Sequence, residues 1–155
     1  MIRFFLAGII QGSIPESRIH SQDYREEIKC AIRGAVGDAQ IYCPIENHPR
    51  SLDYADDRAR SVFFDLMTRA ADTDVLVAFL PEASMGTAIE MWQAHRAGAL
   101  VLAVSPLSVN WVVRFLADRV FPTFEDLETF LRNDEFRQLL ADKGPPAHPE
   151  AHRHA

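Results

Sequence analysis

Residues 74–90 read DVLVAFLPEASMGTAIE, an apolar run followed by a proline, a glycine turn and a glutamate. The run at residues 74–80 is nearly all apolar, which is typical of a parallel strand covered on both of its faces. Pro81 ends it, and after Gly86 we expect a helix over residues 87–97. The stretch therefore predicts a central strand and a helix, joined by a loop that contains Ser84.

The same alternation of strand and helix extends in both directions from this stretch. Strands are expected at residues 2–7, 39–43, 74–80, 100–104 and 120–121. Helices are expected at residues 21–36, 56–71, 87–97, 109–117 and 124–140, and a polar loop over 46–54. Because parallel neighbours require crossover helices, this order predicts an α/β fold: a flavodoxin-like or Rossmann-like, doubly wound, five-stranded parallel sheet. On the helix at 56–71, a core face is formed by the spacing of Val62, Phe63, Leu66 and Ala70.

The composition is that of one ordinary globular domain. The chain has 155 residues, of which 48% are apolar and 25% charged, and its net charge of -6 comes without a basic run. That charge argues against a nucleic-acid polymer as partner, and the first apolar run is too short to span a membrane. Cys30 and Cys43 lack metal-ligand spacing, so we expect a cytoplasmic protein with reduced thiols, without metal or cofactor. We expect residues 1–142 to form the domain and the Pro/His-rich residues 143–155 to be a disordered tail.

In a doubly wound sheet, ligands bind beyond the carboxyl ends of the strands. This rule selects the loops at residues 8–13, 43–51 and 80–87. The last of these leads into the helix that carries Glu90, and a helix N-terminus provides backbone donors for an anion. We expect Glu90 to face the ligand and to be kept ionised by the helix dipole. The spacing alone is equally typical of an exposed glutamate that complements the dipole.

Two segments resemble the nucleoside 2-deoxyribosyltransferase superfamily. They are the strand at 74–80 followed by SMGTAIE at 84–90, and FLAGIIQG at 5–12, which is similar to the first strand and glycine loop of that family. The superfamily includes deoxynucleoside 5′-monophosphate N-glycosidases and CMP hydrolases. The resemblance covers residues 2–117 and implies a nucleoside or nucleotide substrate, a homodimer, and a retaining displacement. In that reaction Glu90 attacks the anomeric carbon, the base leaves, and water or a second base resolves the glycosyl-enzyme.

A second carboxylate is implied by the same resemblance. Asp65 precedes Glu90 by about the separation found in the family, and it would orient the sugar or pass a proton to the leaving base. As a residue of a helix, Asp65 is otherwise an ordinary surface carboxylate. We expect the two carboxyl groups to converge on one sugar-sized space in an enzyme, and to diverge in a binding module.

Ser84 bears on the substrate. At the position six residues before the nucleophile, the family's transferases typically have an acidic residue. Its nucleotide hydrolases have a serine there, which contacts the 5′-phosphate. Here the resemblance implies that a 5′-phosphate is bound by Ser84, by the helix start near Gly86 and by the backbone amides of Ile10, Gln11 and Gly12. Gly8, at the start of the same glycine loop, is a further substrate-binding candidate. The hydrolases often have an arginine where Gln11 stands, so a cation is missing. Ser84 is otherwise a turn residue that caps the next helix.

Three further side chains are substrate-binding candidates. Glu46 and His48 lie on the loop after the second strand, where they would hydrogen-bond to a base edge, although a structural role in the loop explains them equally well. Asn110 and Trp111 begin a helix that packs at the dimer interface in the family and reaches into the neighbour's site, although a buried aromatic residue would look the same. Tyr24 falls on an apolar stripe and is expected in the core.

Three other interpretations compete with this one. The cytokinin-type nucleotide phosphoribohydrolases are more distantly similar, but their paired glycines are absent from this chain. A non-catalytic nucleotide-binding or signalling module on the same fold is favoured by the missing cation near Gln11. An interaction domain would present an exposed apolar patch in place of a polar cleft.

Overall fold

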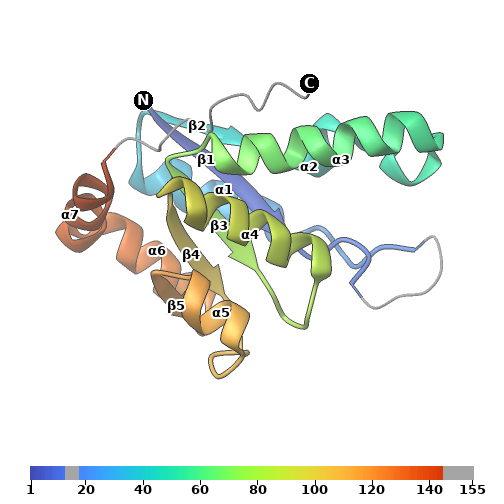
Figure 1. Cartoon of the computed structure of the whole chain (residues 1–155). Coiled ribbons are helices and arrows are strands. Elements are labelled where there is room, and N and C mark those ends of the chain that lie inside the picture. The colour runs from blue at the N-terminus through green and yellow to red at the C-terminus, as the bar shows by residue number, and fades with distance from the viewer. Residues whose placement is uncertain (13–17, 145–155) are drawn as a thin grey trace.

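The computed structural model describes residues 1–12 and 18–144, which form strands and helices in alternation (Figure 1). The strands are β1 (Ile2–Gly8), β2 (Ala39–Tyr42), β3 (Val75–Phe79), β4 (Leu100–Val104) and β5 (Arg119–Phe121). The helices are α1 (Tyr24–Ala35), α2 (Pro44–Asn47), α3 (Asp56–Ala71), α4 (Met85–Ala97), α5 (Trp111–Leu116), α6 (Phe124–Arg132) and α7 (Asp134–Lys143), with a 3₁₀ turn at Ser51–Asp53.

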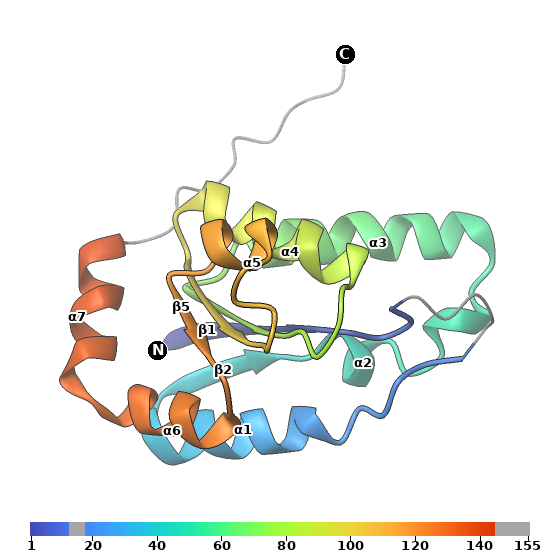
Figure 2. The same ribbon diagram turned by 90° about the horizontal axis from the view of Figure 1, so that it is seen from below.

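The sheet is parallel throughout, with the strand order β2-β1-β3-β4-β5. Helices α1, α6 and α7 cover one face, and α3, α4 and α5 cover the other (Figure 2). The chain leaves β1 for β2 on one side and returns to β3 on the other, so the switch point lies between β1 and β3, where Gly8 pairs with Phe79. This is the predicted flavodoxin-like, doubly wound fold, and its rule places a ligand at that point.

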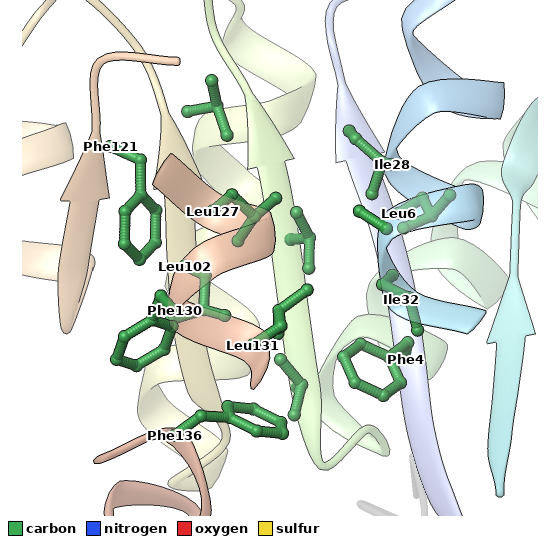
Figure 3. Close-up of a cluster of buried hydrophobic side chains, with 14 of the residues drawn as sticks. Phe4, Leu6, Ile28, Ile32, Leu102, Phe121, Leu127, Phe130, Leu131 and Phe136 are labelled. Carbon is green, nitrogen blue, oxygen red and sulfur yellow. The ribbon is translucent and has the colours of Figure 1, made fainter. Parts of the chain in front are cut away.

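Alternate residues of β1 enter the two halves of the core, because successive side chains of a strand point to opposite faces. Phe4 and Leu6 belong to the half of the core under α1 and α6, in one cluster with Ile28 and Leu127 (Figure 3). Phe5 belongs to the half under α3 and α4. Each of these five side chains is at most 1% exposed, and burying one contributes about 1.5–3 kcal/mol.

Several element boundaries differ from the prediction, and three of the differences change the number of elements or the start of the helix that carries Glu90. The segment expected as a loop over 46–54 contains part of α2 and the 3₁₀ turn, because Pro44 is well suited to the first position of a helix. The last helix is interrupted at Asn133, whose extended backbone (φ -90°, ψ 160°) separates α6 from α7. Helix α4 begins at Met85, earlier than expected, because the Ser84 side chain caps it.

Two observations bear on membranes and metals. Within residues 1–12 and 18–144, none of the helices has the length and hydropathy needed to cross a bilayer. The same residues contain no group of three histidine, cysteine or acidic side chains placed to hold a metal ion. Most of the tail that was expected to be disordered, from residue 145 on, lies outside the described residues.

Candidate active site

A cavity of about 570 Å³ lies at the carboxyl ends of β1 and β3, at the switch point of the sheet. The loop after β1, the 3₁₀ turn, one face of α3 and the first turns of α4 form its wall, and α3 and α4 lie side by side (Figures 1 and 2). Its volume falls within the range of small-molecule sites. The residues that line it are Gly8, Ile10, Gln11, Gly12, Ser51, Leu52, Tyr54, Ala59, Val62, Phe63, Leu66, Met67, Ser84, Met85, Gly86, Thr87, Ile89 and Glu90.

Glu90 is the single carboxylate among these lining residues, and it is 8% exposed. Burial raises its pKa to about 8, and the positive charge of Arg25 offsets part of that rise. The expectation that the helix dipole keeps Glu90 ionised at neutral pH is therefore wrong. The dipole acts mainly within the first turn, whereas Glu90 lies in the second turn of α4, where loss of water contact outweighs it.

Arg25 is a buried cation at the end of β1. Its guanidinium donates hydrogen bonds to the carbonyl oxygens of Leu6 (2.9 Å) and Gly8 (3.3 Å) and to Oε1 of Gln22 (2.7 Å). These bonds hold the positive charge of Arg25 next to Gly8, which lines the cavity. Sequence reasoning missed Arg25, because nothing in the residues around it indicates that the arginine turns inward instead of toward water.

The glycine loop and the start of α4 lie where the motif predicts. Gly8, Ile10, Gln11, Gly12, Ser84 and Gly86 all line the cavity together with Glu90. A Cβ on Gly8 would lie 2.4 Å from the hydroxyl of Tyr24, which is buried as expected, so only glycine fits there. Gly12 has a φ of +56°, which also favours glycine.

Ser84 performs the capping role that was one of its two interpretations. Its Oγ accepts hydrogen bonds from the backbone N–H of Thr87 (3.4 Å) and from the hydroxyl of Thr87 (3.0 Å). The side chain still forms part of the cavity wall. No lysine or arginine is found among the described residues that line the cavity, so a cation for a phosphate is not supplied by its wall.

Asp65 does not converge with Glu90. It is exposed, accepts a hydrogen bond from Nε of Arg69 at 2.7 Å, and is not a lining residue. Successive side chains of a helix point in directions about 100° apart. Asp65 therefore points away from the cavity, because its neighbour Leu66 is the residue that faces it. The residues of α3 that do meet the cavity are apolar: Ala59, Val62, Phe63, Leu66 and Met67. Three of these, Val62, Phe63 and Leu66, had been assigned to the core.

The other predicted binding residues lie around the cavity and not in its wall. Glu46 forms an ion pair with the buried Lys29 and so connects the α2 segment to α1. His48 contacts Tyr54, which lines the cavity: its Nδ1 lies 3.4 Å from the tyrosine hydroxyl. Asn110 caps α5 by accepting a hydrogen bond from the N–H of Val112 (3.0 Å). It lines an adjacent cavity of about 440 Å³ that shares Gly12, Ser84 and Met85 with the first.

Tyr54 is a lining residue that sequence reasoning did not single out. It follows the 3₁₀ turn, is half-buried, and has the guanidinium of Arg58 3.8 Å from its ring centroid. The segment around it is polar and irregular. Because it has no helical or strand periodicity, the sequence does not predict the direction of the tyrosine ring. Only the packing of this segment against α3 brings the tyrosine to the cavity.

Comparisons with known proteins agree with the class that this fold and cavity define, a doubly wound α/β protein with a small-molecule site at its switch point. No family model matches the sequence, and no curated protein is significantly similar to it. A solved 2-deoxyribosyltransferase from Bacillus psychrosaccharolyticus superposes with a TM-score of 0.64 and 17% identity, over 88% of this chain and 95% of that one. A conserved protein from Enterococcus faecalis V583 gives a TM-score of 0.61 and 21% identity, over 85% and 98%.

A CMP N-glycosidase from Clostridium botulinum is also similar, at 15% identity over 83% of this chain and 97% of that one. Its TM-score of 0.48 is too low to support a shared fold by itself. The first two similarities show that this chain shares the fold of that 2-deoxyribosyltransferase and of the conserved protein.

Proposed function

We propose that this protein cleaves or exchanges the N-glycosidic bond of a nucleoside, with Glu90 as the nucleophile. The observation that carries the proposal is the position of Glu90: a buried carboxylate in the switch-point cavity of a fold shared with a 2-deoxyribosyltransferase. An oxocarbenium-like transition state needs a carboxylate within bonding reach of the anomeric carbon, and Glu90 is the lining residue that can provide it.

The proposed reaction has two displacements. The Glu90 carboxylate attacks the anomeric carbon, the C–N bond breaks, and its electron pair leaves with the base. Water or a second base then attacks the glycosyl-enzyme and restores the carboxylate. Burial makes the ionised carboxylate poorly solvated and therefore reactive, and Arg25 favours the ionised form without touching the substrate.

The cavity wall favours nucleosides over nucleoside 5′-monophosphates. Its polar donors near α4 are Ser84 and the backbone of the helix start, and the described lining residues of this cavity and of the adjacent one include no lysine or arginine. A bound phosphate is usually matched by such a cation or by several converging donors. Binding of a 5′-phosphate therefore stays a weaker proposal, and unphosphorylated nucleosides are the substrates that we expect.

We propose that the protein is a homodimer and that α4 and α5 form its interface. Four aromatic or apolar side chains on these helices are largely exposed: Met85 (81%), Trp92 (48%), Trp111 (76%) and Phe115 (58%). Exposed apolar surface of this kind is typical of an interaction site. Trp111→Asp is expected to convert a dimer into a monomer in sedimentation equilibrium. Phe64→Asp, at an exposed aromatic of α3, is the matched control and should leave the dimer intact.

A non-catalytic nucleotide-binding module is the second candidate. The position of Asp65, exposed and away from the cavity, favours it, because the expected convergence of two carboxylates is not seen. Such a module would bind a nucleoside or nucleotide in the same cavity and release no base. The two candidates are therefore separated by turnover and not by binding.

The test is release of free base from a panel of ribonucleosides, deoxynucleosides and their 5′-monophosphates, each with and without an acceptor base. We expect the wild type to release base and Glu90→Ala to lose this by about 10⁴-fold or more, as for removal of other nucleophiles. Asp65→Ala is the matched control, since it deletes a carboxylate outside the cavity, and it should keep nearly full activity. Binding of a nucleoside without release by the wild type would establish the binding module instead.

A further inference from the structure

The side chains of Tyr54, His48 and Tyr42 form an array that leads away from the cavity. The Tyr54 hydroxyl lies 3.4 Å from Nδ1 of His48, and Nε2 of the same imidazole lies 3.5 Å from the Tyr42 hydroxyl. The rings of His48 and Tyr54 also meet edge to face, with centroids 6.1 Å apart. Only Tyr54 lines the cavity, so the imidazole and the second tyrosine act on a ligand through it.

The environment of Tyr42 indicates how the imidazole is protonated. Tyr42 stacks on Phe5 at the edge of the core, and burial raises the pKa of its hydroxyl. The hydroxyl therefore keeps its proton, and it can donate a hydrogen bond to Nε2 of His48 when the other ring nitrogen carries the imidazole hydrogen. The proton of a neutral imidazole then resides on Nδ1, which donates toward the Tyr54 oxygen and leaves the Tyr54 O–H free to point at a ligand.

The proposed reaction requires a group with this property. A departing nucleobase accumulates negative charge on its ring and leaves readily only when a proton reaches it. Within the described lining of the cavity, Glu90 and Tyr54 are the only side chains with an ionisable acid group, and Glu90 is engaged as the nucleophile. His20 is close to Gly12 but lies outside the lining, where it faces Glu82 at 3.2 Å.

We propose that Tyr54 is the acid and base of the reaction, and that His48, held by Tyr42, is the residue that positions it. This inference rests on the proposed function, since it names the group that protonates the base which Glu90 displaces. It also explains why the apolar face of α3 carries no second carboxylate: the proton comes from the turn before α3.

The steps balance as follows. As the C–N bond breaks, its electron pair remains on the base, and the base takes the Tyr54 proton. The tyrosinate oxygen is stabilised by the Nδ1–H of His48 and by the Arg58 guanidinium above the ring. In the second displacement the tyrosinate takes a proton from the attacking water, which adds to the anomeric carbon and frees the Glu90 carboxylate. The net reaction is hydrolysis, and every protein group returns to its starting form.

A comparison of leaving groups tests this inference. The test uses the nucleoside that the wild type cleaves best and the 4-nitrophenyl glycoside of the same sugar, because 4-nitrophenolate leaves without a proton. Tyr54→Phe is expected to lower kcat/KM on the nucleoside by about 10²-fold, the lower end of general-acid contributions, and to change the nitrophenyl reaction less than about threefold. His48→Gln should show the same selectivity with a smaller loss, of about tenfold.

Two controls make each outcome decisive. Phe63→Leu alters the same cavity wall without removing an ionisable group, so it should change both substrates by one common factor. Glu90→Ala should abolish both reactions. An equal loss on both substrates with Tyr54→Phe, or no loss on the nucleoside, overturns the role of Tyr54 while the proposed function stands. If Glu90→Ala stays active, or if the wild type cleaves neither substrate, the proposed function itself fails.

Discussion

Helices α3 and α4 form opposite sides of one cavity, and each was predicted to bring a carboxylate to it. On α4, Glu90 reaches the cavity; on α3, Asp65 faces water and Leu66 takes the place at the wall. The difference lies in how each helix begins. Ser84 caps α4 directly after β3, whereas the cap position of α3, Ala55, follows an irregular segment and makes no side-chain hydrogen bond. Glu90 and the start of its helix belong to one motif, which predicts the side-chain direction, whereas the spacing from Asp65 to Glu90 is counted across the end of α3, β3 and a loop and does not.

After the loss expected for Glu90→Ala, the largest expected effect is the dependence of activity on pH. Because burial raises the pKa of Glu90 to about 8, kcat/KM should rise about tenfold per pH unit below 8 and level off above it. Between pH 5 and pH 8 this amounts to roughly 10³-fold. The measurement is kcat/KM from pH 5 to 10, with Asp65→Asn in parallel. An unchanged pH profile of kcat/KM in Asp65→Asn supports Glu90 as the titrating group. A rising limb that shifts in this variant would contradict it.

Stability should respond to the same carboxyl group. The folded-state pKa is raised above its unfolded value, so the folded state holds a proton that the unfolded chain releases between about pH 4.5 and 8. Wild-type stability therefore falls as pH rises through that window. Glu90→Gln removes the dependence and should be more stable than wild type by a few kcal/mol at pH 9, with little difference at pH 4. Urea unfolding at both pH values measures this, and equal stability at pH 9 would show that Glu90 is not desolvated.

Moving the carboxylate of α3 by one position, from residue 65 to residue 66, tests the wall that α3 contributes to the cavity. Leu66→Asp places a carboxyl group on the apolar wall and is expected to cost about 2–4 kcal/mol of unfolding free energy at pH 7. Asp65→Leu changes an exposed position and should cost less than about 0.5 kcal/mol. Both values come from the same denaturation experiment. Two similar, small costs would mean that Leu66 and Asp65 are equally open to water.

The smallest effects concern the helix starts. Ser84→Ala removes the cap of α4 and should cost about 1 kcal/mol, whereas Ala55→Ser adds a cap to α3 and should stabilise by up to about 1 kcal/mol. Thermal unfolding of the two variants measures both changes. If Ser84→Ala has no effect on Tm, the capping bond does not hold α4 in its register, and the contrast between the helices needs another cause.

Much of the fold could be predicted because it depends on local patterns. The apolar runs of β1 and β3 and the apolar stripe of α1 each lie within a short stretch of the chain, and each is found where expected. The division of the last helix at Asn133 was not predicted, since the pattern on both sides of it is helical. The site was predicted where one motif contained a strand end and the loop after it, as at residues 5–12 and 74–90.

The sequence by itself therefore determined the order of strands and helices, the parallel sheet, and the place of Glu90 after β3. Only the tertiary structure decided that Leu66 and not Asp65 meets the cavity, that Tyr54 belongs to its wall, and that the pKa of Glu90 is raised. The physical reason is that secondary structure follows from neighbours along the chain, whereas burial and charge environment depend on residues far apart in it. Arg25 and Glu90 influence each other across the end of β1, and no local pattern contains both.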